Sequence, residues 1–135
     1  MYNQILSSLN DFIDNDLSFD SDQKKTLLHK HKLALSDSLQ KGHWTTNLCL
    51  IASNLAKKNP RDIASALITR LENQSEIAKV ELAGPGFVNI FLTREAFFNQ
   101  LDDAYKNPNS FVESSHAMKE KIQIEFVSAN PTGPL

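Results

Sequence analysis

The sequence predicts an α+β fold, in which an antiparallel sheet of three to four strands has helices packed on one face. Two kinds of hydrophobic spacing lead to this prediction. Some stretches repeat apolar residues every three or four positions, as amphipathic helices do, and others alternate apolar with polar residues, as strands do. A Gly-Pro-Gly corner joins two of the alternating stretches into a hairpin, which makes their pairing antiparallel.

This hairpin, within residues 79–93, is predicted to be the centre of the fold. Its strands are expected over 77–83 and 86–92, with Ala83-Gly84-Pro85-Gly86 as the corner, because Gly tolerates positive φ and Pro fixes its own φ. Alternation then separates two faces of the second strand. The face expected to be buried under helices carries Val88, Ile90 and Leu92. The opposite face carries Phe87, Asn89 and Phe91.

The second face has two interpretations. An aromatic ring with a carboxamide two residues away can stack on an unpaired base and hydrogen-bond its edge, as in RNA recognition. Alternatively, Phe87 and Phe91 pack under a second helix and Asn89 caps a loop, since most aromatic residues belong to cores. Composition alone favours the second interpretation.

Five helices are expected, over residues 2–14, 20–28, 46–58, 60–73 and 94–106. Candidate N-caps are Asp20, Thr45 or Thr46, Asn59 before Pro60, and Thr93. The last helix has an apolar stripe that we expect in the core, made of Phe97, Phe98, Leu101, Ala104 and Tyr105.

Residues 31–36 are predicted to form a further strand, although their spacing also fits a helix, and 36–44 a polar loop. His29 and His31 would share a strand face, which raises the question of a zinc site. Such a site needs further ligands at defined spacing, and Cys49 does not supply it. A solvated edge of His and Lys residues is the favoured explanation.

The C-terminal part is predicted to be a linker, 107–120, followed by the beginning of a second domain, 121–135. Ile122, Ile124 and Phe126 alternate like a strand, and a turn-rich loop follows them. A strand that leads into such a loop is how a Rossmann-type nucleotide-binding sheet begins its active site. Residues 1–106 would then be the N-terminal domain.

The composition is that of an ordinary globular protein: 135 residues, 41% hydrophobic, 22% charged, with a formal net charge of −2. Because RNA is a polyanion, a chain of this charge is expected to contact RNA locally, or to leave most of the RNA contact to other domains. Lys57, Lys58 and Arg61 form a basic corner that is either a phosphate contact or simply solvated. One cysteine excludes an internal disulfide and fits a reducing cytoplasm, and no apolar run reaches membrane-spanning length.

Two function classes fit these observations: an RNA-binding module of a larger enzyme, or a protein-interaction domain. The face with Phe87 and Asn89 favours the first, and the acidic balance favours the second. A self-contained enzyme is disfavoured, because no nucleophile–base pair, metal constellation or P-loop is recognisable in the sequence.

Two motifs carry a resemblance to a known family. Residues 80–92, Val-Glu-Leu-Ala-Gly-Pro-Gly-Phe-Val-Asn-Ile-Phe-Leu, closely resemble the end of the N-terminal additional domain of arginyl-tRNA synthetases. Residues 124–135 resemble the start of that family's class I catalytic domain, which leads into a His-x-Gly-His signature. Weaker matches at Thr46-Asn47 and Lys58-Asn59-Pro60-Arg61 lie in the family's order. His43 stands where the family usually has Asp.

The resemblance implies a parent enzyme, a monomer, that joins L-arginine to its tRNA through an arginyl-adenylate, with ATP and Mg²⁺. It implies that this domain contacts the tRNA D-loop through Phe87 and Asn89, with Gly84 and Gly86 as further tRNA-binding residues, and that the 135 residues alone bind no cofactor and have no ligase activity. It also implies that Ser128 and Asn130 help to hold arginine. The signature region would begin with Ala129, Asn130, Pro131, Thr132, Gly133, Pro134 and Leu135.

Overall fold

The computed structural model describes residues 1–108, and the five predicted helices and three predicted strands are all present there. The elements are, in chain order, α1 (Tyr2–Asn15), α2 (Ser21–Lys30), β1 (Leu33–Leu35), the 3₁₀ turn η1 (Leu39–Lys41), β2 (Trp44–Thr46), α3 (Leu48–Ala56), α4 (Pro60–Glu72), β3 (Ile77–Ala83), β4 (Phe87–Leu92) and α5 (Arg94–Lys106). Residues Met1–Asp102 form one compact unit. The sheet, the core and the candidate site all belong to this unit. The α+β prediction is therefore confirmed for this unit.

The sheet has four antiparallel strands in the order β1-β2-β4-β3, which agrees with the predicted three to four. β2 was not predicted, because Trp44–Thr46 is too short to show alternation. The sequence predicts a loop over 36–44 and a helix from residue 46, and both predictions are wrong where they overlap Trp44–Thr46. β1 is also shorter than the predicted 31–36.

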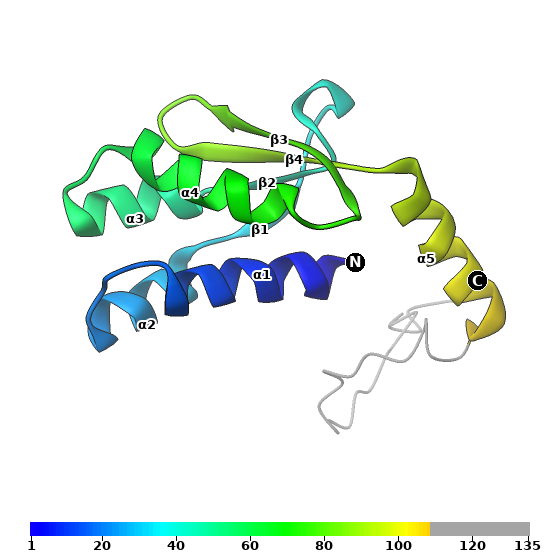
Figure 1. Ribbon diagram of the computed structural model, residues 1–135, viewed down its shortest axis with the longest axis horizontal. Helices are drawn as coiled ribbons and strands as arrows, with labels where there is room; N and C mark the ends of the chain where they lie inside the picture. Colours follow the sequence, from blue (N-terminus) through cyan, green and yellow to red (C-terminus); the bar gives the residue numbers. More distant parts are fainter. Residues whose placement is uncertain (109–135) are drawn as a thin grey trace, which may run out of the picture. The chain divides into compact units, whose positions relative to one another are not determined.

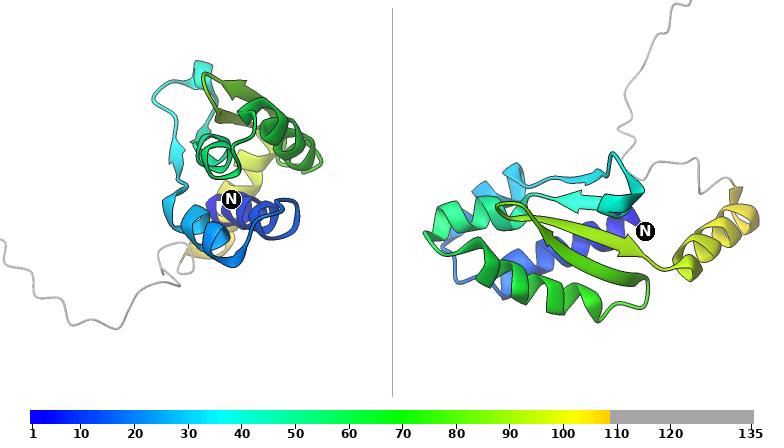
Figure 2. Two further views of the ribbon diagram at one scale, coloured as in Figure 1. Left: turned by 90° about the vertical axis from the view of Figure 1, so that its left-hand side faces the viewer. Right: turned by 90° about the horizontal axis from the view of Figure 1, so that it is seen from above.

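Helices cover one face of this sheet. α4 packs on β3 and α3 on β4, and α1 and α2 lie against α3 and α4 on their other side (Figures 1 and 2). Val88 and Ile90 are fully buried and Leu92 nearly so, which confirms the predicted inner face. Complete burial of a Leu, Ile or Phe side chain is worth about 1.5–3 kcal/mol each. The fully buried large side chains are Leu9, Phe12, Ile13, Leu27, Leu48, Leu67, Leu71 and Ile90.

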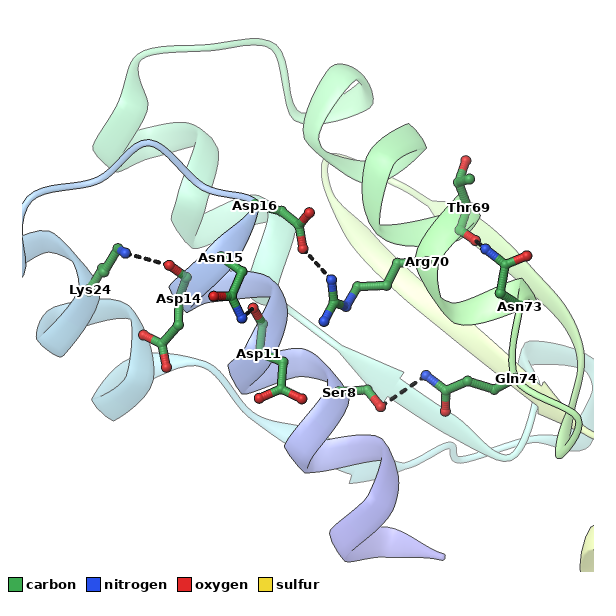
Figure 3. Close-up of polar contacts among 10 residues, drawn as sticks. All are labelled: Ser8, Asp11, Asp14, Asn15, Asp16, Lys24, Thr69, Arg70, Asn73 and Gln74. Atoms are coloured by element: carbon green, nitrogen blue, oxygen red, sulfur yellow. Dashed lines mark hydrogen bonds and ion pairs between the residues drawn. The ribbon is translucent and has the colours of Figure 1, made fainter.

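Polar contacts join α1 to the elements around it (Figure 3). Arg70 of α4 pairs with Asp16 at 2.5 Å, and the Gln74 amide donates to the Ser8 hydroxyl at 2.9 Å. The Lys24 ammonium of α2 donates to the Asp14 carbonyl at 2.6 Å. These exposed or half-buried bonds orient α1, while its buried apolar stripe supplies most of the stabilisation.

Three of the four predicted helix caps are present. Asp20 forms a full capping box with Gln23, Asn59 accepts from the Arg61 N–H ahead of α4, and Thr93 accepts from the Ala96 N–H. The predicted Thr45 or Thr46 cap of α3 is wrong in position, because both residues lie in β2 and Asn47 occupies the N-cap position. The Thr46 hydroxyl nevertheless accepts a hydrogen bond from the Leu48 N–H, the first of α3, at 3.3 Å.

The apolar stripe of α5 is not part of the core, contrary to the prediction. Phe97, Phe98, Leu101 and Tyr105 are 40%, 53%, 65% and 88% exposed, and Ala96 is the buried residue of this helix. Helical spacing predicts that large apolar residues share a face, but it carries no information on what covers that face. No helix within residues 1–108 is both long and apolar enough to cross a membrane.

Candidate nucleic-acid interface

The corner between β3 and β4 is fixed by its contact with α3. The Gly86 carbonyl accepts a hydrogen bond from the Leu50 N–H at 3.0 Å. Gly86 has φ 136°, and a Cβ there would lie 2.9 Å from the Leu50 Cα, so the approach requires glycine. Phe87 follows Gly86 directly, so the contact with α3 also fixes the backbone position from which the Phe87 side chain extends.

Phe87 and Asn89 both lie on the sheet face opposite α3 and α4, as the alternation predicted. Phe87 is 38% exposed and Asn89 is 8% exposed. The neighbouring strand places Thr45 directly beside Asn89. The alternative, in which Phe87 and Phe91 pack under a second helix, does not describe Phe87, since its ring is partly open. Phe91 is half-buried, with the Lys79 ammonium 5.5 Å from its ring centre.

A pocket of about 450 Å³ lies over this face, a volume within the range of small-ligand sites, about 300–1,000 Å³. Asn89 and Thr45 line it from the sheet, and Phe87 lines it beside the corner residues Ala83 and Gly84. The connection between β1 and β2, cyan in Figure 1, rises above the sheet and supplies further lining residues. These further residues are Ser36, Asp37 and Lys41, and Leu35 at the end of β1 also lines the pocket.

The Asn89 carboxamide has unused hydrogen-bonding capacity. Within residues 1–108 its side chain has no hydrogen-bond partner, and its amide atoms are not among the buried polar atoms that lack one, so they are open to the pocket. An amide without a partner, beside a partly exposed aromatic ring, is suited to a ligand that has both a hydrogen-bonding edge and a flat face.

His43 contacts the end of β4 that lies away from Phe87. Its Nδ1 accepts a hydrogen bond from the Leu92 N–H at 2.9 Å, and its ring meets Phe97 edge-on at 4.9 Å. A carboxylate could accept the same bond, which offers a physical reason why His can stand where the resembled family usually has Asp. Sequence reasoning gave no role for this residue, because the bond joins positions 49 residues apart.

The structure does not bring the basic corner to the pocket. Lys57, Lys58 and Arg61 are exposed at the junction of α3 and α4, and Lys57 has the left-handed φ of 51°. α3 has nine residues with a rise of roughly 1.5 Å each, so Lys57 lies about 13 Å from the N-terminal end of α3. That end contacts the corner between β3 and β4. Lys58 lines a different cavity, of about 250 Å³.

The two neighbouring histidines do not share a strand face. His29 is in the last turn of α2 and is exposed, whereas His31 is the C-cap residue and is buried. The His31 Nε2 lies 3.0 Å from the Asn10 Oδ1, and its buried Nδ1 has no partner among the described residues. The solvated-edge explanation is therefore wrong for His31. No cluster of three metal-ligating side chains occurs within residues 1–108.

Cys49 is completely buried in α3, and burial raises the pKa of its thiol to about 12. A thiol of that pKa has almost no thiolate near neutral pH, so it is unreactive. The predicted arginine-binding residues Ser128 and Asn130 lie outside the described residues, as do the linker after residue 108, the strand with Ile122, Ile124 and Phe126, and the rest of the signature region.

Sequence reasoning found Phe87 and Asn89 but missed Thr45, Asp37 and Lys41 as lining residues. The spacing of Asp37 and Lys41 was a possible signal, because opposite charges four residues apart often pair. Thr45 gave no signal, since its place beside Asn89 depends on a strand that was not predicted.

Comparison with known proteins confirms the resemblance seen in residues 80–92. The family described as "Arginyl tRNA synthetase N terminal domain" matches residues 3–92. The arginine–tRNA ligase of Psychrobacter cryohalolentis is 45% identical over 94 residues, which are 70% of this chain and 15% of that protein. The arginine–tRNA ligase of Psychrobacter sp. strain PRwf-1 is 41% identical over 104 residues, which are 77% of this chain and 17% of that protein.

A relative from another genus gives the same result. The arginine–tRNA ligase of Thioalkalivibrio sulfidiphilus is 40% identical over 94 residues, 70% of this chain and 16% of that protein. The chain thus spans about a sixth of the length of the curated relatives that it matches. The family match runs from α1 to the end of β4, and the chain belongs to the arginyl-tRNA synthetase family, of which residues 3–92 are the N-terminal domain.

Proposed function

We propose that this domain binds the tRNA of an arginine–tRNA ligase by taking one unstacked D-loop base into the pocket over β2 and β4. Phe87 stacks on the face of the base, and Asn89 hydrogen-bonds its edge. The observation that carries the proposal is the Asn89 carboxamide, which has no hydrogen-bond partner among the described residues and is open to the pocket beside the partly exposed Phe87 ring. Aromatic stacking with edge recognition is how proteins read unpaired bases in RNA.

The charge of the chain supports a local contact of this kind. With a formal net charge of −2, the chain has no excess of cations for a broad electrostatic grip on RNA. Stacking on a single base and hydrogen bonding to its edge do not require an excess of cations. A protein-interaction role remains the second candidate function, and the exposed apolar stripe of α5 is the observation that favours it.

The rest of the proposal concerns the whole enzyme. The relatives are named arginine–tRNA ligases, so we infer that the parent protein joins L-arginine to tRNA with ATP and Mg²⁺ through an arginyl-adenylate, on a class I catalytic domain in the cytoplasm. Ser128 and Asn130 are proposed to help hold arginine. We expect no ligase activity from residues 1–135 alone, since they match 15% to 17% of the length of those relatives.

The exposed basic residues at the junction of α3 and α4 are a proposed second contact. Lys57, Lys58 and Arg61 would meet the phosphate backbone away from the pocket, and such contacts position RNA without reading its sequence.

The Phe87→Ala variant tests the proposal. Loss of base stacking is expected to weaken binding of an arginine-accepting tRNA to the 135-residue chain by about 1–3 kcal/mol. The melting temperature should change little, because the Phe87 ring is 38% exposed. Binding is measured by fluorescence anisotropy and stability by circular dichroism.

Phe98→Ala is the matched control, because Phe98 is an exposed ring that does not line the pocket. It should bind tRNA as the unmodified chain does. Unchanged tRNA affinity in the Phe87→Ala variant, combined with a large drop in melting temperature, would show that Phe87 is a core residue and not a recognition residue.

A further inference from the structure

The connection between β1 and β2 is firmly attached to the sheet just beyond the pocket. Gly42, with φ 84°, lies so close to β4 that a Cβ would be 2.7 Å from the Ile90 carbonyl oxygen. The His43 N–H donates to the same oxygen at 2.8 Å. Lys41, the residue before Gly42, therefore has a backbone position set by β4, the strand that carries Phe87 and Asn89.

Hydrogen bonds within the connection hold Lys41 further. Its N–H donates to the Ser38 carbonyl at 2.9 Å, and its own carbonyl accepts from the Ser36 hydroxyl at 3.2 Å. The Ser38 hydroxyl accepts from the Gln40 N–H at 3.2 Å. These hydrogen bonds fix the backbone of the β1–β2 connection without a ligand. The Lys41 side chain therefore extends from a fixed backbone position in the pocket wall.

The charged end of Lys41 is held by Asp37. The ammonium lies 3.1 Å from the Asp37 Oδ2, and the two side chains are 62% and 75% exposed. Both residues line the same pocket as Phe87 and Asn89. An ion pair with this exposure is screened by water, contributes little to stability and exchanges partners readily.

The lining has a charge pattern that suits a nucleotide. Asp37 and Lys41 are its charged members among the described residues, and the residues that would contact a base are neutral. A nucleotide whose base enters the pocket brings its phosphate to the rim. Lysine is a common phosphate ligand and acts as a point charge, so it does not require a strict orientation.

We propose that Lys41 binds the phosphate of the nucleotide whose base enters the pocket, and that Asp37 holds the Lys41 ammonium in the absence of RNA. The inference rests on the proposed function and extends it from the base to its phosphate. Asp37 competes with the phosphate for the ammonium and also repels the RNA, so it lowers the affinity of the site.

Two variants with opposite expected effects test the proposal. Lys41→Gln should weaken tRNA binding to the 135-residue chain about three- to tenfold at moderate salt, and should make the slope of log affinity against log KCl concentration less negative by about 0.7–0.9. Asp37→Asn should tighten binding several-fold, because it frees the ammonium and removes a repelling carboxylate. Lys25→Gln, an exposed lysine of α2 outside the pocket, is the charge-matched control and should leave the slope unchanged.

The binding of an arginine-accepting tRNA transcript is measured over a series of KCl concentrations, together with Phe87→Ala. If Phe87→Ala weakens binding while Lys41→Gln has the slope of the unmodified chain, the phosphate role is overturned and the base-binding function stands. If Phe87→Ala binds normally, the base-binding function itself fails. Weaker binding by Asp37→Asn would also overturn the proposal, because it would make the carboxylate a favourable contact.

Discussion

At the scale of single residues, burial decides the chemistry of the titratable side chains in the core. His31 is 8% exposed, and desolvation lowers its pKa from the usual value of 6.5. The folded domain therefore favours neutral His31, while the unfolded chain takes up a proton more readily. The stability that His31 contributes is fully present above pH 6.5 and is lost as pH falls below that value.

This pH dependence is testable with His31→Gln, which cannot titrate but keeps a donor toward Asn10. The fall in melting temperature between about pH 7 and pH 5 should be smaller in this variant than in the unmodified chain. His29→Gln is the control, because His29 is exposed two residues away. Equal pH dependence in all three proteins would contradict the assignment to His31.

Residue-level prediction from the sequence worked where it depended on strand parity. The placement of Phe87 and Asn89 opposite Val88 and Ile90 needs only a period of two and no knowledge of neighbours. His43 could not be predicted in this way, because its role is a bond to the backbone of Leu92. The missing partner of Asn89 is also invisible in sequence, since it depends on every side chain that surrounds the amide.

At the scale of elements, local sequence signals predicted the long helices and the hairpin correctly. They failed for the short strand β2 and for the burial of α5. Asn59 before Pro60 set the start of α4 because cap and proline act within a few residues. β2 has three residues and is held in the sheet by pairing with β4, a long-range interaction. The apolar spacing correctly predicted that α5 is a helix. Whether its apolar stripe is buried depends on which elements lie nearby in three dimensions.

The corner between β3 and β4 offers an element-level prediction. Gly86→Ala places a Cβ against the backbone of α3 at a φ that L residues rarely adopt, and should reduce the free energy of unfolding by about 2–4 kcal/mol. Gly84→Ala should cost only about 1–2 kcal/mol, since its φ is 54° and a Cβ there meets open space. Urea denaturation compares the two variants, and a Gly86→Ala protein as stable as the Gly84→Ala protein would show that the corner is not held by α3.

At the scale of the whole described unit, the fold separates stability from recognition. Helices bury one face of the sheet and provide the core, while the other face, carrying Phe87 and Asn89, has the pocket. The pocket draws on the hairpin, on β2 and on the β1–β2 connection, so it exists only when the sheet is assembled. This is why the sequence indicated two of its residues and not the pocket itself.

The most direct test of the central claim is a double-mutant cycle between Phe87 and the D-loop. Binding of the unmodified chain and of the Phe87→Ala variant is measured with an arginine-accepting tRNA and with a set of tRNAs that each lack one D-loop base. At the position of the base that stacks on Phe87, removing the base and the ring together should reduce the free energy of tRNA binding no more than either change does alone. This corresponds to a coupling energy of about 1–3 kcal/mol. Additive losses at every D-loop position would contradict the claim that the Phe87 ring stacks on a D-loop base.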